Sequence, residues 1–241
     1  MKYKHPMTAA ELVAKLDADP DFQRRKAEKE RKWAERRAAV DEMLRPILDD
    51  LRNAGITAES IEEMTQRYAP LPPQIVQVLL GWLPRVQDDR VKESLIRSLG
   101  AAREPFDGRL LVESFLHDTS ETLRWPIANT MAEARPFGVA DWLVEAVKKR
   151  SFGNARGMLV IALARLAPTE TSLLVLLSVL DQLPGYVATA FGEVGGVAQL
   201  NALHSRMDNV QGWEKAEFLK AIRKIESRLR DSAAGLGSER T

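Results

Sequence analysis

Apolar side chains recur three and four residues apart along almost the whole chain, which is the spacing of one face of an amphipathic helix. No segment sustains the alternation of apolar and polar residues that a strand requires, and helix-favouring Ala, Leu, Glu, Arg and Lys dominate. From about residue 70 onward, short turns interrupt the pattern at APLPPQ, REPFDG, ARPFG, LAPTE and LPG. The pattern therefore predicts an all-α protein with short helices in its later part.

A longer helix is predicted over roughly 20–54. Asp19 and Asp21 are both candidates for its N-cap, and Gly55 follows its last turn. Pro46 lies inside it and should bend or restart it. Its second half carries an apolar stripe that we expect to pack on the rest of the protein, formed by Trp33, Val40, Leu44, Ile47 and Leu51.

The first half of this helix, residues 23–32, has no apolar face. Its basic residues alternate with acidic ones, and the pairs Asp21–Arg25 and Glu28–Lys32 have the favourable acid-first spacing of four. This pattern favours a helix that faces solvent. The local excess of positive charge over 22–40 leaves a second interpretation open, in which the segment is an arm for nucleic acid or an acidic partner.

An internal repeat becomes visible after residue 85. Three stretches superpose without gaps when shifted by 32 residues: RVKESLIRSLGAAR at 90–103, TLRWPIANTMAEAR at 122–135 and NARGMLVIALARLA at 154–167. The apolar positions that coincide are Val91, Leu123 and Ala155, then Leu95, Ile127 and Leu159, then Leu99, Met131 and Leu163. Between these stretches lie further helical segments such as FDGRLLVESFL and VADWLVEAVKK. Each unit is therefore a helical hairpin, and only stacking can bury the apolar stripes of both its helices.

The stretch DDRVKESLIRSLGAA at 88–102 resembles the second helix of the HEAT-repeat superfamily, particularly its short bacterial, PBS-lyase-type form. An acidic residue, an apolar–basic pair and a Leu-Gly end stand as they do in that family, and the pattern recurs more weakly at 120–134 and 152–166. The resemblance covers roughly 70–230 and implies a right-handed α-solenoid of about five helical hairpins. In the family the aligned charged residues form contacts that hold adjacent units together. The resemblance implies this bracing role for Lys92, Arg124, Arg156 and Lys215.

Two departures from the family pattern are Pro126, inside a second helix, and the unit PGYVATAFGEVGG, which lacks the charged residues. We expect residues 1–68 to form an N-terminal helical cap with the long charged helix, and residues 69–230 to form the repeat domain. Residues 231–241, DSAAGLGSERT, are small and polar, which predicts a disordered tail.

Composition narrows the function classes. The net charge is only +1, whereas a nucleic-acid-binding domain is usually strongly basic. The chain has no cysteine, which excludes disulfides, thiol nucleophiles and thiolate metal sites. Neither the N-terminus nor the longest apolar run, SLLVLLSVL, is long enough to serve as a signal or to span a bilayer. These features predict a soluble, cytoplasmic protein that does not insert into a membrane.

No motif indicates catalysis. His5, His117 and His204 are scattered, and neither HExxH nor GxSxG occurs. The glycines of GEVGG at 192–196 are predicted to end a helix rather than to bind phosphate, because no strand precedes them and no Lys-Ser/Thr follows. We therefore expect no catalytic residue, no metal and no cofactor.

Trp125 is the candidate for a binding residue. The other four tryptophans fall on apolar stripes and are predicted to pack in the core: Trp33, Trp82, Trp142 and Trp213. Trp125 aligns instead with Glu93 and Gly157, off the stripe, and the second helices of a HEAT-like stack line its concave face. Alternatively, a kink at Pro126 turns the indole inward. The predicted partner-binding set is Arg90, Glu93, Arg97, Trp125, Asn129 and Asn154.

The sequence thus favours a non-catalytic scaffold that binds a protein or peptide on its concave face. One alternative is a nucleic-acid-binding protein like the DNA glycosylase-like members of the superfamily, which the balanced charge disfavours. The other alternative is a bilin lyase-like enzyme, and the type of repeat is the only feature of the sequence that supports it. Neither the identity of the partner nor the oligomeric state follows from the sequence.

Overall fold

The computed structural model describes residues 7–117 and 121–238, and every regular element in these ranges is a helix. The chain is 76% helical and forms 13 α-helices over the described ranges, which confirms the all-α prediction. Two short 3₁₀ helices, Arg150–Phe152 and Met207–Asn209, lie between them. The chain begins with α1 (Ala9–Asp17) and the long helix α2 (Pro20–Asn53).

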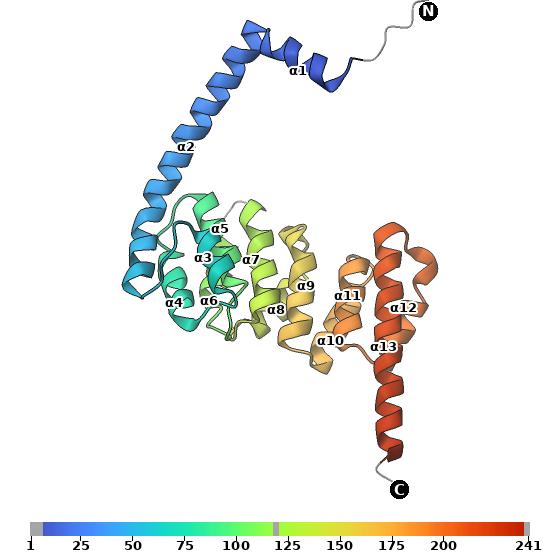
Figure 1. Cartoon of the computed structure of the whole chain (residues 1–241). Helices are drawn as coiled ribbons and strands as arrows, with labels where there is room; N and C mark the ends of the chain where they lie inside the picture. The colour runs from blue at the N-terminus through green and yellow to red at the C-terminus, as the bar shows by residue number, and fades with distance from the viewer. Residues whose placement is uncertain (1–6, 118–120, 239–241) are drawn as a thin grey trace, which may run out of the picture.

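The remaining helices form two rows (Figure 1). In the first row each helix packs on the next: α3 (Ile61–Tyr68), α5 (Asp89–Leu99), α7 (Glu121–Ala134), α9 (Ala155–Leu166), α11 (Pro184–Val194) and α13 (Gly212–Ser238). The second row contains α4 (Pro73–Trp82), α6 (Arg109–His117), α8 (Ala140–Ala146), α10 (Glu170–Ser178) and α12 (Val197–His204). Each second-row helix packs against the first-row helix that follows it in the chain.

The positions that coincide in the sequence repeat are equivalent in the structure. The side chains of Val91, Leu123 and Ala155 are buried on α5, α7 and α9, and the two following sets of three are fully buried. They belong to one continuous apolar core that runs from α2 to α13. Full burial of such a side chain contributes about 1.5–3 kcal/mol, so this shared seam is the main source of stability.

Backbone hydrogen bonds also join successive connecting turns. The Leu71 N–H donates to the Ala101 carbonyl at 2.7 Å, and the Leu71 carbonyl accepts from the Arg103 N–H at 2.8 Å. Phe137 makes the same kind of isolated parallel bridge one unit later, next to Asp107. These bridges satisfy backbone groups in the turns without forming a sheet.

Helix α2 starts where predicted but is not interrupted. Asp19 is its N-cap, accepting from the backbone N–H groups of the next turn, and Gly55 follows its end with a φ of +83°. The restart expected at Pro46 does not occur, because the helix continues to Asn53. Pro46 is exposed, so the carbonyl that loses its hydrogen bond lies on the solvent side.

The prediction that Trp33 and Trp213 pack in the core is wrong. Trp33 is 67% exposed, since the first half of α2 extends beyond the two rows (Figure 1). Trp213 is 55% exposed and lies edge-on against Tyr186, with ring centroids 5.5 Å apart. Both residues are on the expected helix face, but at the ends of the molecule little lies opposite that face.

The other two core tryptophans are partly buried. Trp142 packs edge-on against Phe115 with centroids 5.3 Å apart, and Trp82 donates from Nε1 to Asp50 Oδ2 at 2.8 Å. At the C-terminal end, α13 continues to Ser238, so residues 231–238, where we expected disorder, are helical. Residues 239–241 of the expected tail lie outside the described residues.

Arginine side chains link neighbouring helical pairs. Arg156 is buried and donates to the Val147 carbonyl and to Gln182 Oε1, both at 3.0 Å, so it braces adjacent units as the resemblance implied. Its burial lowers the pKa of the guanidinium, and the nearby charge of Arg150 adds to this effect. Lys215, by contrast, is exposed at the start of α13.

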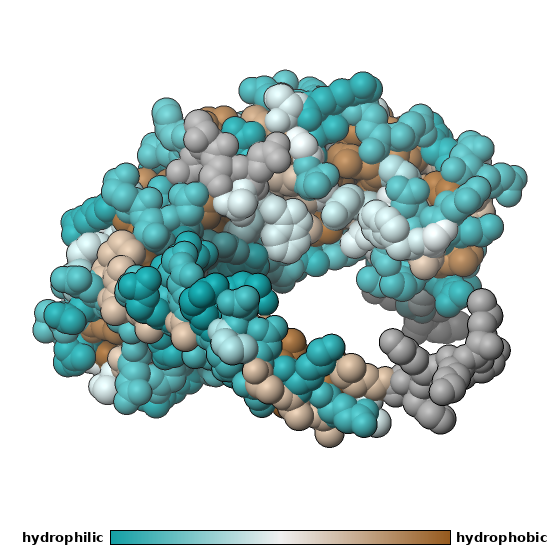
Figure 2. Space-filling model, turned by 90° about the horizontal axis from the view of Figure 1, so that it is seen from above, coloured by the Kyte–Doolittle hydropathy of each residue, from teal (hydrophilic) through white to brown (hydrophobic). Residues whose placement is uncertain are grey.

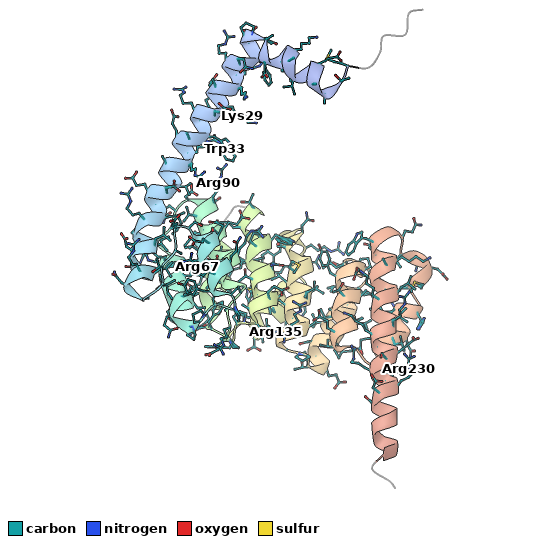
Figure 3. The ribbon with its side chains drawn as sticks, viewed as in Figure 1. Lys29, Trp33, Arg67, Arg90, Arg135 and Arg230 are labelled. Atoms are coloured by element: carbon teal, nitrogen blue, oxygen red, sulfur yellow. The ribbon has the colours of Figure 1, made fainter. Side chains whose placement is uncertain are left out.

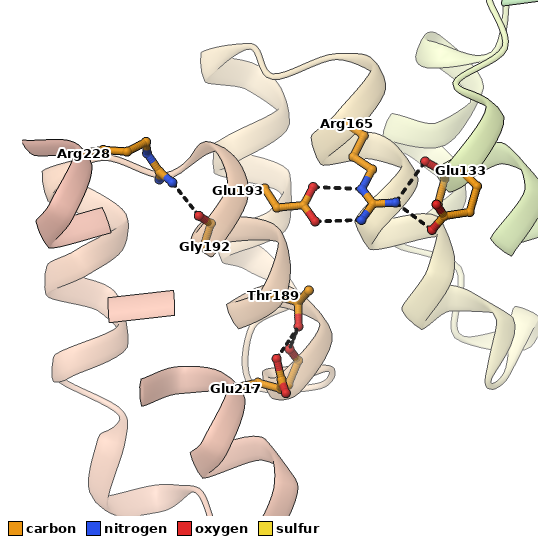
Figure 4. A network of polar contacts seen from close by, with 9 residues as sticks. Glu133, Arg165, Thr189, Gly192, Glu193, Glu217 and Arg228 are labelled. Atoms are coloured by element: carbon orange, nitrogen blue, oxygen red, sulfur yellow. Dashed lines mark hydrogen bonds and ion pairs between the residues drawn. The ribbon is translucent and has the colours of Figure 1, made fainter. Parts of the chain in front are cut away.

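The strongest contact of this kind between helices was not predicted from the sequence. Arg165 on α9 lies between Glu193 of α11 and Glu133 of α7 (Figure 4). It donates from Nε and Nη2 to the two carboxylate oxygens of Glu193 and from Nη1 to Glu133 Oε1, each at 2.8 Å. Chiefly these hydrogen bonds from Arg165 hold the pKa of Glu193 below its ordinary value. Three consecutive first-row helices are thereby tied by one guanidinium.

Replacement of Gly157 by alanine should destabilise the protein by about 1–3 kcal/mol, because overpacking a tight contact forces neighbouring side chains to move. A Cβ at Gly157 of α9 would lie 2.4 Å from the ring of Tyr186 on α11. The matched control is Gly81→Ala on α4, where a Cβ meets nothing within 4 Å. Chemical denaturation measures both variants, and equal stability of the two would contradict this account of the α9–α11 approach.

The variant Glu193→Gln should lose about 1 kcal/mol of stability at neutral pH, since it removes the charge from hydrogen bonds to Arg165. The lowered pKa of Glu193 means that the stabilisation is present above its ordinary pKa of 4.5 and is lost as pH falls through the lowered value. The difference between wild type and variant should therefore shrink below about pH 4.5. Denaturation at several pH values tests this, with the more exposed Glu133→Gln as the weaker control.

Candidate binding surface

Three of the predicted binding residues lie on one face of α5. Arg90, Glu93 and Arg97 line a cleft of about 410 Å³ between α5 and α3. Arg97 forms an ion pair with Glu93, with 2.7 Å between Nη2 and Oε1. Arg90 forms no ion pair within the described residues and is exposed. The cleft therefore presents one paired and one unpaired guanidinium.

Hydroxyl groups hold the two walls of this cleft together. Ser94 donates to Glu62 Oε1 at 2.9 Å, and Thr65 donates to Ser98 Oγ at 2.7 Å. A third link comes from Thr130 of α7, which donates to the Ile96 carbonyl at 2.8 Å. These bonds fix α3 and α7 on either side of α5, so the cleft is a rigid feature of the fold.

Trp125 points outward rather than into the core. It is 37% exposed, and the guanidinium of Arg97 lies 5.7 Å from the centre of its ring. Pro126 is buried inside α7 and does not turn the indole inward. Trp125 thereby extends the α5 surface onto the next helix of the row.

A second cavity lies beyond Trp125. Its volume is about 210 Å³, and its walls come from α7, the 3₁₀ helix and the start of α9: Arg124, Trp125, Phe152, Asn154 and Ala155. The predicted residues Trp125 and Asn154 therefore meet here. Asn129, one turn further along α7, is half-buried and lines neither of these two cavities.

Arg124 is unusual among the residues of this cavity. Its guanidinium lies beside the paired rings of Phe115 and Phe152, 5.8 and 5.7 Å from their centres. Its Nε is buried and has no hydrogen-bond partner among residues 7–117 and 121–238. At the equivalent position of the next unit, Arg156 has two acceptors. A buried N–H without an acceptor is unfavourable, so Arg124 contacts its neighbours through the two aromatic rings and lacks the hydrogen bonds from Nε that Arg156 makes.

The sequence analysis missed a further surface on α2. The first half of this helix presents a shallow depression of about 580 Å³, lined by Lys26, Lys29, Glu30, Trp33, Ala34 and Arg37. It continues into a cleft of about 630 Å³ where Trp33 and Arg37 lie opposite Arg90 and Ser94 of α5. Figure 3 shows Lys29, Trp33 and Arg90 on the same side of the molecule. From above, an N-terminal segment of mixed hydropathy and the two rows of helices border an open space (Figure 2).

Other candidate residues lie apart from these surfaces. His117 ends α6 and His204 ends α12, while His5 lies outside the described residues. Over residues 7–117 and 121–238, no three histidine or acidic side chains gather as a metal-binding group would. Gly195 is the C-cap of α11, as predicted for GEVGG. No helix in the described part of the chain combines the length and the apolar character needed to cross a bilayer.

Comparison of the chain with family models, with curated proteins and with solved structures gives no match.

Arg124→Met and Arg156→Met should differ although the two residues are equivalent in the repeat. Arg156→Met removes two buried hydrogen bonds and should cost about 1–3 kcal/mol. Arg124→Met removes a donor without an acceptor, and we expect its stability to stay within about 1 kcal/mol of the wild type. Urea unfolding of the two variants measures the difference. A larger loss for Arg124→Met would show that this residue has a structural role.

Proposed function

We propose that the chain is a right-handed α-solenoid of HEAT type, with about five hairpins and an N-terminal cap formed by α1 to α3. Two observations support this architecture. Each first-row helix packs on its successor, and residues 32 apart in sequence occupy equivalent buried positions. Solenoids of this kind carry their binding sites on an extended surface along the row.

We further propose that the protein is a non-catalytic interaction module for a polypeptide partner. The observation that carries this proposal is the exposed indole of Trp125, stacked with Arg97 and bordering the cavity where Arg124 Nε has no acceptor. Tryptophan and arginine dominate the binding energy of protein interfaces. A partly exposed tryptophan–arginine pair beside a donor without an acceptor is typical of a surface on which a partner supplies the missing contacts.

The mixed charge of this surface favours a polypeptide over nucleic acid. Glu62 and Glu93 line the same cleft as Arg90 and Arg97. Carboxylates in this position repel a phosphate backbone, on which nucleic-acid affinity mainly depends. A protein partner can pair with charges of both signs and gains specificity from them.

The substitution Trp125→Ala tests this proposal. In affinity purification from the source cells, recovery of the bound partner should fall roughly tenfold or more, as for the loss of an interface anchor. The control is Leu174→Ala on α10, which removes a side chain that is 60% exposed in the second row. Thermal melts should show both variants folded. Undiminished recovery with Trp125→Ala, or recovery of nuclease-sensitive material alone, would refute the proposal.

A further inference from the structure

The face by which α2 packs on the body continues beyond the body. Leu44, Ile47 and Leu51 are buried on this face, and Val40 is partly buried. Going toward the N-terminus at the same helical spacing of three and four, the face is continued by Arg37, Arg36, Trp33, Lys29 and Lys26. We call these five residues the inner arm face. In the second half of α2 this face packs on the body, whereas in the first half no other part of the described chain covers it.

Ion pairing separates the inner arm face from the opposite face of the helix. The opposite face carries Arg24 with Asp21 at 2.9 Å, Lys32 with Glu28 at 2.7 Å, and Arg31 with Glu35 at 3.8 Å. There, three of four bases meet an acid, and Arg25 forms no ion pair in the described structure. The expected pair Asp21–Arg25 is therefore not formed, because Asp21 pairs with Arg24 instead. In the described structure none of the four bases of the inner arm face forms an ion pair.

The inner arm face therefore carries a net positive charge. The depression on the first half of the arm contains three of these bases, Lys26, Lys29 and Arg37, and one acid, Glu30, so positive charge exceeds negative charge there. The indole of Trp33 lies among them. Paired charges on both faces would be enough to keep this helix soluble. The difference between the two faces points to a ligand of negative charge.

The length of the inner arm face limits how long a ligand segment can lie along it. Lys26 to Val40 covers about 21 Å of helix at about 1.5 Å per residue. At its lower end the inner arm face opens into the cleft in which Trp33 and Arg37 lie opposite Arg90 (Figure 3). A segment lying along the arm can therefore reach α5 without a break.

We propose that the inner arm face binds an acidic segment of a polypeptide partner, with an apolar side chain of that segment against Trp33. This inference rests on the proposed function, and it adds a second contact area and the charge of the partner. Glu30, together with Asp41 and Glu62 at the base of the arm, interrupts the positive surface. This pattern disfavours a continuous phosphate backbone. A second copy of the chain is disfavoured because two such faces repel each other.

The test uses the full chain and a dye-labelled synthetic peptide of about 18 residues, helix-forming, with Glu on its polar face and Leu on its apolar face. Binding is followed by fluorescence anisotropy at about 0.15 M salt. The inner triple variant Lys26→Gln, Lys29→Gln, Arg37→Gln should weaken binding roughly tenfold. Trp33→Ala should weaken it roughly fivefold or more.

The matched control is the outer triple variant Arg24→Gln, Arg31→Gln, Lys32→Gln. It removes the same charge from the same helix but from the opposite face, and binding should stay within about twofold of the wild type. Equal weakening by both triple variants would show unspecific attraction and would overturn the proposal. So would the absence of peptide binding to the wild-type chain.

Two further arms of the experiment examine other ligands. Labelled oligothymidine that binds more tightly than the peptide, with loss in the inner triple variant, would make the inner arm face a nucleic-acid site and overturn the proposal. Sedimentation that shows a dimer abolished by Trp33→Ala would assign the face to a second copy, with the same consequence. Circular dichroism confirms that each variant remains helical.

The failure of this inference is distinguishable from failure of the proposed function. If the inner triple variant and Trp33→Ala leave peptide binding and partner recovery unchanged while Trp125→Ala reduces recovery, the inner arm face is not a site and the first-row surface remains one. If Trp125→Ala also has no effect on recovery, the proposed function fails.

Discussion

The burial of apolar stripes between successive helical pairs is the interaction on which the whole structure depends. Val91, Leu123 and Ala155 occupy the same place in three consecutive helices, and each lies in a seam shared with a neighbour. A single pair of such short helices could not exclude water from both its faces. Because the core continues from unit to unit, the outward positions are released from packing and are free to carry function.

The same constraint determines what happens at the ends of the row. A terminal helix has a neighbour on one side only, so its free face must suit water. On α2 the apolar stripe changes to basic residues between Val40 and Arg37, close to where the body ends. Solubility requires charge there but does not require that the charge remain unpaired. Within the described residues no base of the inner arm face forms an ion pair, whereas three of the four bases on the other side of the helix do, and packing does not explain this difference.

Arginines at related positions in this protein differ in how far their hydrogen bonds are satisfied. Arg165 has four acceptor contacts across three helices, and Arg156 has two. Arg124 occupies the same repeat position as Arg156 but has a buried Nε without an acceptor, next to exposed Trp125. The first two arginines link neighbouring helices, whereas the third lines a cavity of about 210 Å³.

The sequence by itself determined the helical class, the ends of most helices and the buried positions of the repeat, since these follow from local spacing and turn chemistry. It also placed Arg90, Glu93 and Arg97 on one helix face. Only the tertiary structure decided that Trp33 and Trp213 are exposed and that Arg165 links Glu133 and Glu193. The physical reason is that periodicity defines which face of a helix is apolar or charged, whereas the element that lies opposite that face depends on how distant parts of the chain pack.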